Sequence, residues 1–206
     1  MTLLKAIAPI ENFFSDYASR LQAILASSDW SPVAQLAEDL RRCWIEKKQV
    51  FICGNGGSAG NAIHLANDFV YGIAKRTGGG MRINALSANP AVLTCLANDV
   101  GYDRIYSEQL AVQAEPDDLL LVLSGSGNSA NILAALQQAK VMKVKSYAIL
   151  GYSGGRSKDL ADVAIHFAVD DMQIAEDLQL VVGHMLMQWC YENRPQVELE
   201  EGVSCA

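Results

Sequence analysis

The chain has 206 residues, of which 50% are hydrophobic and 19% charged. This length and composition suit one globular domain with a sizeable core and exclude a disordered chain. The formal net charge is −7 and there is no long basic run, which excludes an extended nucleic-acid-binding surface.

Membrane and secretory features are not predicted. No apolar run is long enough to span a bilayer, and residues 1–14 lack the layout of a signal peptide. The cysteines are odd in number and none are spaced C-x-x-C, which argues against a disulfide framework or a zinc knuckle. The sequence therefore predicts reduced thiols and a cytoplasmic protein with no membrane contact.

Two helices are expected first. Apolar residues recur at helical spacing over residues 11–26. A second helix is expected from Ser31, its N-cap, and Pro32, its first residue, to about residue 48. Its buried stripe would be Leu36, Leu40, Cys43 and Trp44.

Short apolar runs and helical patterns then alternate. Strands are expected at residues 50–53, 83–86, 119–123, 146–150 and 163–167. Helical patterns are expected at residues 59–71, 91–96, 103–112, from the end of the Gly/Ser run to 140, and 172–191. This order predicts a parallel α/β sheet buried on both faces. We expect one domain over residues 1–194 and a solvated acidic tail over 195–206.

The most informative loop runs from Ser124 to Ser129 and lies between an expected strand and an expected helix. A helix start presents free N–H groups, and glycines let an anion approach the backbone closely. Hydroxyls at Ser124, Ser126 and Ser129 would complete a phosphate site without a lysine. The alternative is an ordinary turn in which Asn128 or Ser129 caps the helix.

A second Gly-rich loop, Gly54 to Ser58, also joins a strand to a helix. Two such loops at the carboxyl ends of parallel strands can face one pocket. A dinucleotide site is disfavoured, because the next strand is followed by Ser87 rather than an acid. No nucleotide cofactor is expected.

Histidines and carboxylates on two helices suggest a zinc-like site. His64 and Asp68 are four residues apart and share a helix face. Glu176 and His184 are eight apart, about 12 Å of rise, so Asp177 is a rival ligand that aligns better with His184. The alternative is an ordinary helix histidine with solvated acids.

Asn98 and Asp99 either form a helix cap and turn, or place the Asp99 carboxylate over the pocket.

Together these motifs resemble the sugar isomerase (SIS) domain and, within it, the phosphoheptose isomerases. The resemblance runs from about residue 49 to 187, and more weakly through the N-terminal helices. It implies a three-layer α/β/α fold, flavodoxin-like or Rossmann-like, with a five-stranded parallel sheet. It also implies N-terminal helices that pack in a homotetramer, with sites between subunits. The implied reaction interconverts sedoheptulose 7-phosphate and D-glycero-D-manno-heptose 7-phosphate.

The resemblance also assigns roles to residues. It places the phosphate on Ser124, Gly125, Ser126 and Ser129, and the sugar on Asn55, Gly56, Gly57, Ser58, Asn98, Asp99 and Glu176. The zinc positions fall on His64, Asp68, Glu176 and His184. The proton-transfer pair falls on Asp68 and His184.

Four departures from the family pattern leave other functions open. The family has Glu where this chain has Asp68, Gln at Glu176, commonly Thr at Gly125, and an arginine closer to the base than Arg76. The alternatives are a non-catalytic sugar-phosphate-binding or regulatory SIS protein, of the type that associates with the replication initiator DnaA, and an isomerase of another sugar phosphate.

Overall fold

The structure is a computed structural model, and it describes residues 9–195. By its contacts the chain divides into two compact units, Met1–Trp30 and Ser31–Ala206. The expected acidic tail lies outside the described residues, apart from Pro195.

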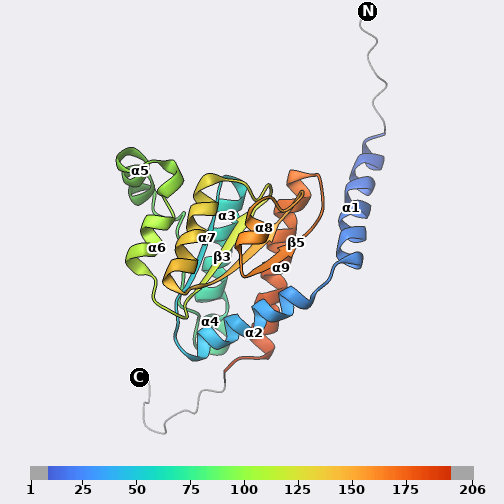
Figure 1. Cartoon of the computed structure of the whole chain (residues 1–206). Coiled ribbons are helices and arrows are strands. Elements are labelled where there is room, and N and C mark those ends of the chain that lie inside the picture. Colours follow the sequence, from blue (N-terminus) through green and yellow to red (C-terminus); the bar gives the residue numbers. More distant parts are fainter. Residues whose placement is uncertain (1–8, 196–206) are drawn as a thin grey trace, which may run out of the picture. The chain divides into compact units, whose positions relative to one another are not determined.

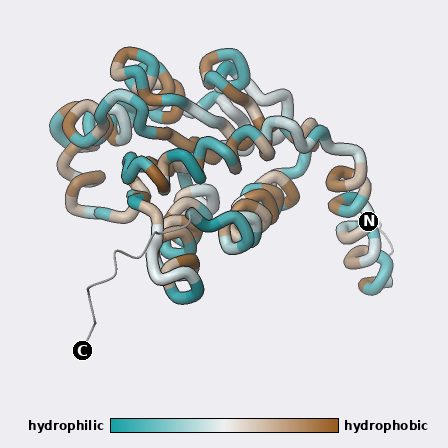
Figure 2. The backbone as a smooth tube through the Cα atoms, turned by 90° about the horizontal axis from the view of Figure 1, so that it is seen from below, coloured by the Kyte–Doolittle hydropathy of each residue, from teal (hydrophilic) through white to brown (hydrophobic). Residues whose placement is uncertain are grey.

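The first unit holds one helix, α1 (Ile10–Ser27), which confirms the helix expected at residues 11–26. Figure 2 shows hydrophobic and hydrophilic residues interleaved along its turns. No residue of α1 is buried, and Phe13 and Phe14 are 65% and 61% exposed. Phe13 and Phe14 therefore present apolar surface on this helix.

The second unit is built on a five-stranded parallel sheet in the order β2-β1-β3-β4-β5 (Figure 1). Its strands are β1 (Val50–Gly54), β2 (Ile83–Ala85), β3 (Leu119–Ser124), β4 (Lys145–Leu150) and β5 (Val163–His166). All five were expected from the sequence, and so was their parallel arrangement.

The helices of this unit cover both faces of the sheet. They are α2 (Ser31–Ile45), α3 (Gly57–Asn67), α4 (Ala74–Thr77), α5 (Pro90–Asp99), α6 (Ser107–Gln113), α7 (Ala130–Met142), α8 (Ser157–Leu160) and α9 (Met172–Glu192). Helix α7 contacts α6, α8, β3 and β4, whereas α3 and α2 contact α9 and the sheet. The result is the expected three-layer α/β/α architecture.

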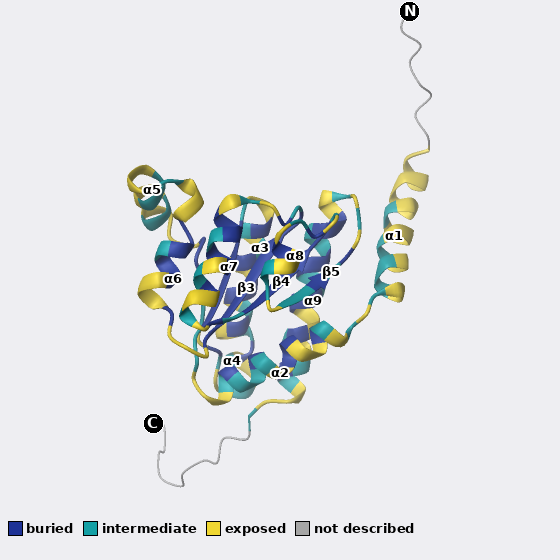
Figure 3. Ribbon diagram, in the orientation of Figure 1, coloured by how far each residue is buried: buried dark blue, intermediate teal, exposed yellow. Residues whose placement is uncertain are grey.

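Alternate strand residues build the core under α6 and α7. Phe51 and Cys53 of β1, Leu120 and Val122 of β3, and Ala148 and Leu150 of β4 belong to one cluster with α7 residues such as Ile132. The period of two follows from strand geometry, in which successive side chains point to opposite faces. The central strands β1 and β3 are buried throughout, whereas β2 and β5 at the sheet edges are largely half-buried (Figure 3).

Three expected helices differ from the prediction. The second ends at Ile45 rather than near residue 48, and Lys47 takes a left-handed φ of 54°. The helix expected at 59–71 is interrupted by a π-helical turn, η1 (Asp68–Gly72). The pattern at 103–112 begins as a 3₁₀ turn, η2 (Tyr102–Arg104), before α6. Helix α8 was not expected.

Along the second helix, Leu36, Leu40 and Cys43 are buried as predicted, and Trp44 is only half-buried. Within residues 9–195, no helix combines the length and apolar character needed to cross a bilayer.

Candidate active site

Both Gly-rich loops lie at one edge of the sheet. Strands β1 and β3 are parallel neighbours, and Gly54 pairs in register with Leu123. The loop after each strand therefore leaves the sheet side by side with the other, as the sequence predicted. Asn55 and Asn131, one from each side, are joined by hydrogen bonds.

The first loop leads into α3. Gly56 and Gly57 are exposed and Asn55 is half-buried, so this loop is open to a ligand. Ser58 differs, because its side chain is buried and its Oγ accepts a 3.0 Å hydrogen bond from Gln179 Nε2. The predicted contact of Ser58 with the sugar stays a prediction.

The second loop presents hydroxyls at the start of α7. Ser129 occupies the N-cap position, but its side chain makes no capping hydrogen bond. Ser124 Oγ is buried and accepts from the Gly127 amide at 3.0 Å, and Ser126 Oγ accepts from the Asn128 amide at 3.3 Å. Acceptance leaves the hydroxyl protons of Ser124 and Ser126 available to donate. The loop is thus not consumed by helix capping, the alternative reading of its sequence.

Gly125 lies beneath two side chains. A β carbon built on Gly125 would stand 2.6 Å from Met172 Sδ and 3.7 Å from Tyr152 Cε2. Met172 begins α9, and Tyr152 lies in the loop after β4 with a φ of 45°. A side chain at this position would have to displace the Met172 thioether, so the glycine here fits the way Met172 packs over the loop.

His64, Asp68 and His184 converge as the sequence suggested. Their ligand atoms lie within 4.8 Å of one another. Asp68 Oδ2 is 3.3 Å from His64 Nε2 and 3.6 Å from His184 Nε2, and the two Nε2 atoms are 3.0 Å apart. Three potential ligand atoms this close need a shared proton or a cation between them. Two imidazole nitrogens and one carboxylate oxygen are a donor set that suits zinc.

Glu176 and its rival Asp177 stand apart from this cluster among the described residues. The Glu176 carboxylate lies against Gly57, where a β carbon would be 2.3 Å from Oε2. This places a negative charge at the N-terminus of α3, where the helix dipole favours it. The role of Glu176 as a fourth metal ligand stays a prediction.

Asn98 and Asp99 end α5 rather than forming the expected separate turn. The Asn98 amide donates to Asp99 Oδ1 at 2.8 Å, and the Cys95 thiol contacts Asp99 Oδ2 at 3.5 Å. Both residues are exposed. Their predicted contact with the sugar stays a prediction.

A cavity of about 490 Å³ adjoins the Asp68 and His184 side chains. It is also lined by Arg76, which the sequence marks only as lying further from the base than the arginine of the family, and the Arg76 guanidinium carbon is 5.0 Å from the ring centre of Tyr191. Tyr191 in turn donates to the Gly72 carbonyl at 3.0 Å. Arg76 lies eight residues after Asp68, beyond the π-helical turn, so helical spacing gave no signal for it.

Comparison with known proteins agrees with this geometry. The SIS domain family matches residues 12–151. The phosphoheptose isomerase of Akkermansia muciniphila is 33% identical over 87% of this chain and 93% of its own length. That of Chlorobaculum parvum is 34% identical, over 84% and 83% of the two chains. A solved phosphoheptose isomerase from Francisella tularensis has a TM-score of 0.84 and 25% identity, covering 90% of this chain and all of its own. The chain therefore belongs to the SIS domain family and, within it, to the phosphoheptose isomerase group.

Proposed function

We propose that this isomerase interconverts sedoheptulose 7-phosphate and D-glycero-D-manno-heptose 7-phosphate by proton transfer. The observation that carries the proposal is the convergence of His64, Asp68 and His184 at one site. The relatives named phosphoheptose isomerase support the same reaction.

In this proposal the phosphate is held by the loop before α7. The hydroxyls of Ser124, Ser126 and Ser129, with the free amides of the helix start, would bind the dianion. Gripping the phosphate fixes the orientation of the distant reacting carbons. The open Asn55–Gly57 loop would bind sugar hydroxyls.

Asp68 and His184 divide the proton transfer. Asp68 takes a proton from the carbon next to the carbonyl, which leaves an enediolate. His184 protonates the enediolate oxygen and then takes back a proton from the hydroxyl of the terminal carbon, while Asp68 returns its proton to the former carbonyl carbon, which completes the change from ketose to aldose. The 3.6 Å between Asp68 Oδ2 and His184 Nε2 supports this division of roles.

His64, Asp68 and His184 would also hold a zinc ion, with Glu176 as the fourth ligand that the resemblance suggests. Bound zinc would supply Lewis acidity that polarises the carbonyl and stabilises the enediolate charge.

The proposal extends to assembly and location. A homotetramer with sites between subunits is supported by the uncovered apolar residues of α1. A cytoplasmic location is supported by the free thiols of Cys43, Cys53, Cys95 and Cys190. Residues 1–194 would form the single SIS domain and residues 195–206 an acidic tail. Light scattering on the purified full chain tests the tetramer.

The central experiment follows sedoheptulose 7-phosphate by NMR with the wild type, Asp68→Asn and Ser126→Ala. The wild type should form the aldose. Asp68→Asn should abolish turnover but keep sugar-phosphate binding, and Ser126→Ala should weaken binding of phosphorylated ligands selectively. Glu38→Gln is a control that removes an exposed carboxylate on α2. Full activity in Asp68→Asn would remove Asp68 from the base role. An inactive, metal-free wild type would favour the regulatory alternative.

A further inference from the structure

The two Gly-rich loops are joined by a reciprocal pair of side-chain amides. Asn55 Nδ2 donates to Asn131 Oδ1 at 2.8 Å, and Asn131 Nδ2 donates to Asn55 Oδ1 at 2.8 Å. Asn55 follows β1, and Asn131 lies in the first turn of α7, two residues after Ser129. The pair thus connects the predicted sugar loop directly to the helix that begins at the predicted phosphate loop.

The pair is well buried on the α7 side. Asn131 is 1% exposed, so its amide exchanges little with water. A buried amide that lost its partner would be left without water or a hydrogen bond, which favours keeping both bonds formed. The arrangement is therefore a rigid connection rather than a surface contact.

Two tyrosines complete the hydrogen bonding around Asn55. Burial raises the pKa of Tyr106 well above its ordinary value, so its hydroxyl keeps its proton and donates to the Gly54 carbonyl. The hydroxyls of Tyr102 and Tyr106 each also lie 3.3 Å from Asn55 Oδ1. Together with the shorter bond from Asn131, these contacts engage both lone pairs of Asn55 Oδ1.

These hydrogen bonds determine which groups of Asn55 remain available to a ligand. Its oxygen is engaged, and one of its two amide protons is given to Asn131. One N–H remains, so Asn55 can donate to a ligand oxygen but cannot accept from a hydroxyl.

We propose that Asn131 is a positioning residue, which fixes the Asn55 donor relative to the phosphate loop so that phosphate and sugar are aligned together. The inference rests on the proposed function and deepens it. Asn131 does not touch the substrate in this scheme and acts through Asn55.

Side-chain NMR tests the connection directly, with inorganic phosphate as the probe. In the wild type, phosphate should shift the backbone amides of Ser126 and Ser129 and also the side-chain amide of Asn55. In Asn131→Ala the backbone shifts should remain and the Asn55 shift should disappear. If phosphate moves the loop amides but not Asn55 in the wild type, or moves Asn55 equally in Asn131→Ala, the inference is wrong. If phosphate moves no loop amide, the proposed phosphate site itself fails, and the inference falls with it.

Kinetics give a second readout. Asn131→Ala should lower kcat about tenfold or more with KM for the sugar phosphate changed less than about threefold, because the phosphate hydroxyls remain. A tenfold loss corresponds to about 1.4 kcal/mol of transition-state stabilisation. Asn84→Ala is the matched control. It removes a 2.9 Å hydrogen bond between the side-chain amides of Asn84 and Gln113, away from both loops. It should leave kcat unchanged.

Two further variants protect the test against misfolding. Asn131→Asp keeps the size and the acceptor for Asn55 Nδ2 but removes the donor to Asn55 Oδ1. Tyr102→Phe removes one of the two tyrosine hydroxyls that contact Asn55 Oδ1, at a residue that is 59% exposed. Both should lower kcat, Tyr102→Phe by about two- to threefold. Unchanged kcat in both would overturn the proposal.

Discussion

The carboxylate of Glu176 lies against the α carbon of Gly57, in the space that any side chain at position 57 would need. A β carbon there would be 2.3 Å from Oε2 and 2.5 Å from Oε1. The contact joins α9 to the first residue of α3, and it accounts for a glycine at a position where helix propensity would favour alanine.

Gly57→Ala should therefore displace Glu176. The carboxylate is the end of a flexible side chain and can swing away, so the melting temperature should change by only about 2 °C. Activity should fall more than stability, because the displaced charge leaves the sugar loop. The matched control is Gly60→Ala on the same helix, where a β carbon meets nothing within 4 Å. Equal activity of the two variants would show that the position of Glu176 is unimportant.

The metal site offers a second prediction. Zinc should bind with one ion per chain in the wild type, and His64→Ala or His184→Ala should lose it, since each removes one of three clustered ligands. Glu176→Gln should keep zinc, because its amide oxygen can still serve as the proposed fourth ligand, whereas Glu176→Ala should weaken zinc binding. Metal analysis of the purified variants measures this. Full zinc retention in Glu176→Ala would remove Glu176 from the proposed ligand set.

Gly125 provides a third prediction. Gly125→Thr should weaken phosphate binding and cost about 1–3 kcal/mol of stability, because its β carbon would overlap Met172 Sδ. In the double variant, Met172→Ala should restore much of the lost phosphate affinity and stability, because removing the Met172 thioether makes room for the threonine. Thermal melts of the single and double variants, with and without inorganic phosphate, measure the coupling between the two substitutions. Strictly additive effects would show that Met172 does not confine the loop.

Most of the sheet could be predicted because parallel strands buried on both faces are continuous apolar runs. Both Gly-rich loops were also evident, since each follows such a run directly. The clustering of His64 with Asp68 followed from helical spacing, and that of His184 was suggested by the resemblance.

Other features depend on tertiary contacts that spacing does not encode. The π-helical turn at Asp68 closes with the Ile73 amide bonded to the Asp68 carbonyl at 2.9 Å, and no residue pattern marked it. Arg76 reaches the cavity beyond that turn. His166 at the end of β5 is another residue whose contacts spacing does not encode. It lies 2.9 Å from the Tyr152 carbonyl and 3.2 Å from Lys158 Nζ, which supports the loop beside Gly125.

Thiol reactivity should follow burial. Burial raises the pKa of Cys43 to about 11 and that of Cys190 to about 12, and it raises the pKa of Cys53 further. In a Cys205→Ser background, a thiol reagent at pH 7 should therefore label only exposed Cys95. The hydrogen bond to Asp99 also raises the pKa of Cys95, so Asp99→Asn should speed its labelling. Rapid labelling of a second thiol in the folded protein would contradict the buried positions.

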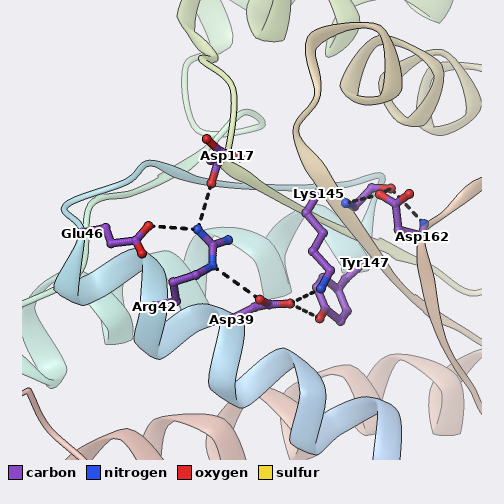
Figure 4. A network of polar contacts seen from close by, with 8 residues as sticks. Asp39, Arg42, Glu46, Asp117, Lys145, Tyr147 and Asp162 are labelled. Carbon is purple, nitrogen blue, oxygen red and sulfur yellow. Dashed lines mark hydrogen bonds and ion pairs between the residues drawn. The ribbon is translucent and has the colours of Figure 1, made fainter.

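Asp39 carries the last prediction, and Figure 4 shows Lys145 and Tyr147 of β4 both directed at its carboxylate. Lys145 Nζ is 2.6 Å from Asp39 Oδ2, and the Tyr147 hydroxyl donates to the same oxygen. Burial alone would raise the pKa of Asp39, but these hydrogen bonds and the charges of Lys145 and Arg42 hold it below its ordinary value.

A depressed folded pKa means that the ionised carboxylate stabilises the fold above the unfolded pKa, near ~4. This contribution is lost as the pH falls through the lower folded pKa. Asp39→Asn should cost about 2 kcal/mol at pH 7, because a hydrogen-bonded charge is removed from a side chain that is only 16% exposed. The difference from wild type should shrink below about pH 4. Asp16→Asn, which breaks an exposed pair with Arg20 on α1, should cost under about 0.5 kcal/mol. Urea unfolding at pH 7 and pH 3 measures both, and a pH-independent cost for Asp39→Asn would show that the carboxylate charge is not what holds α2 to β4.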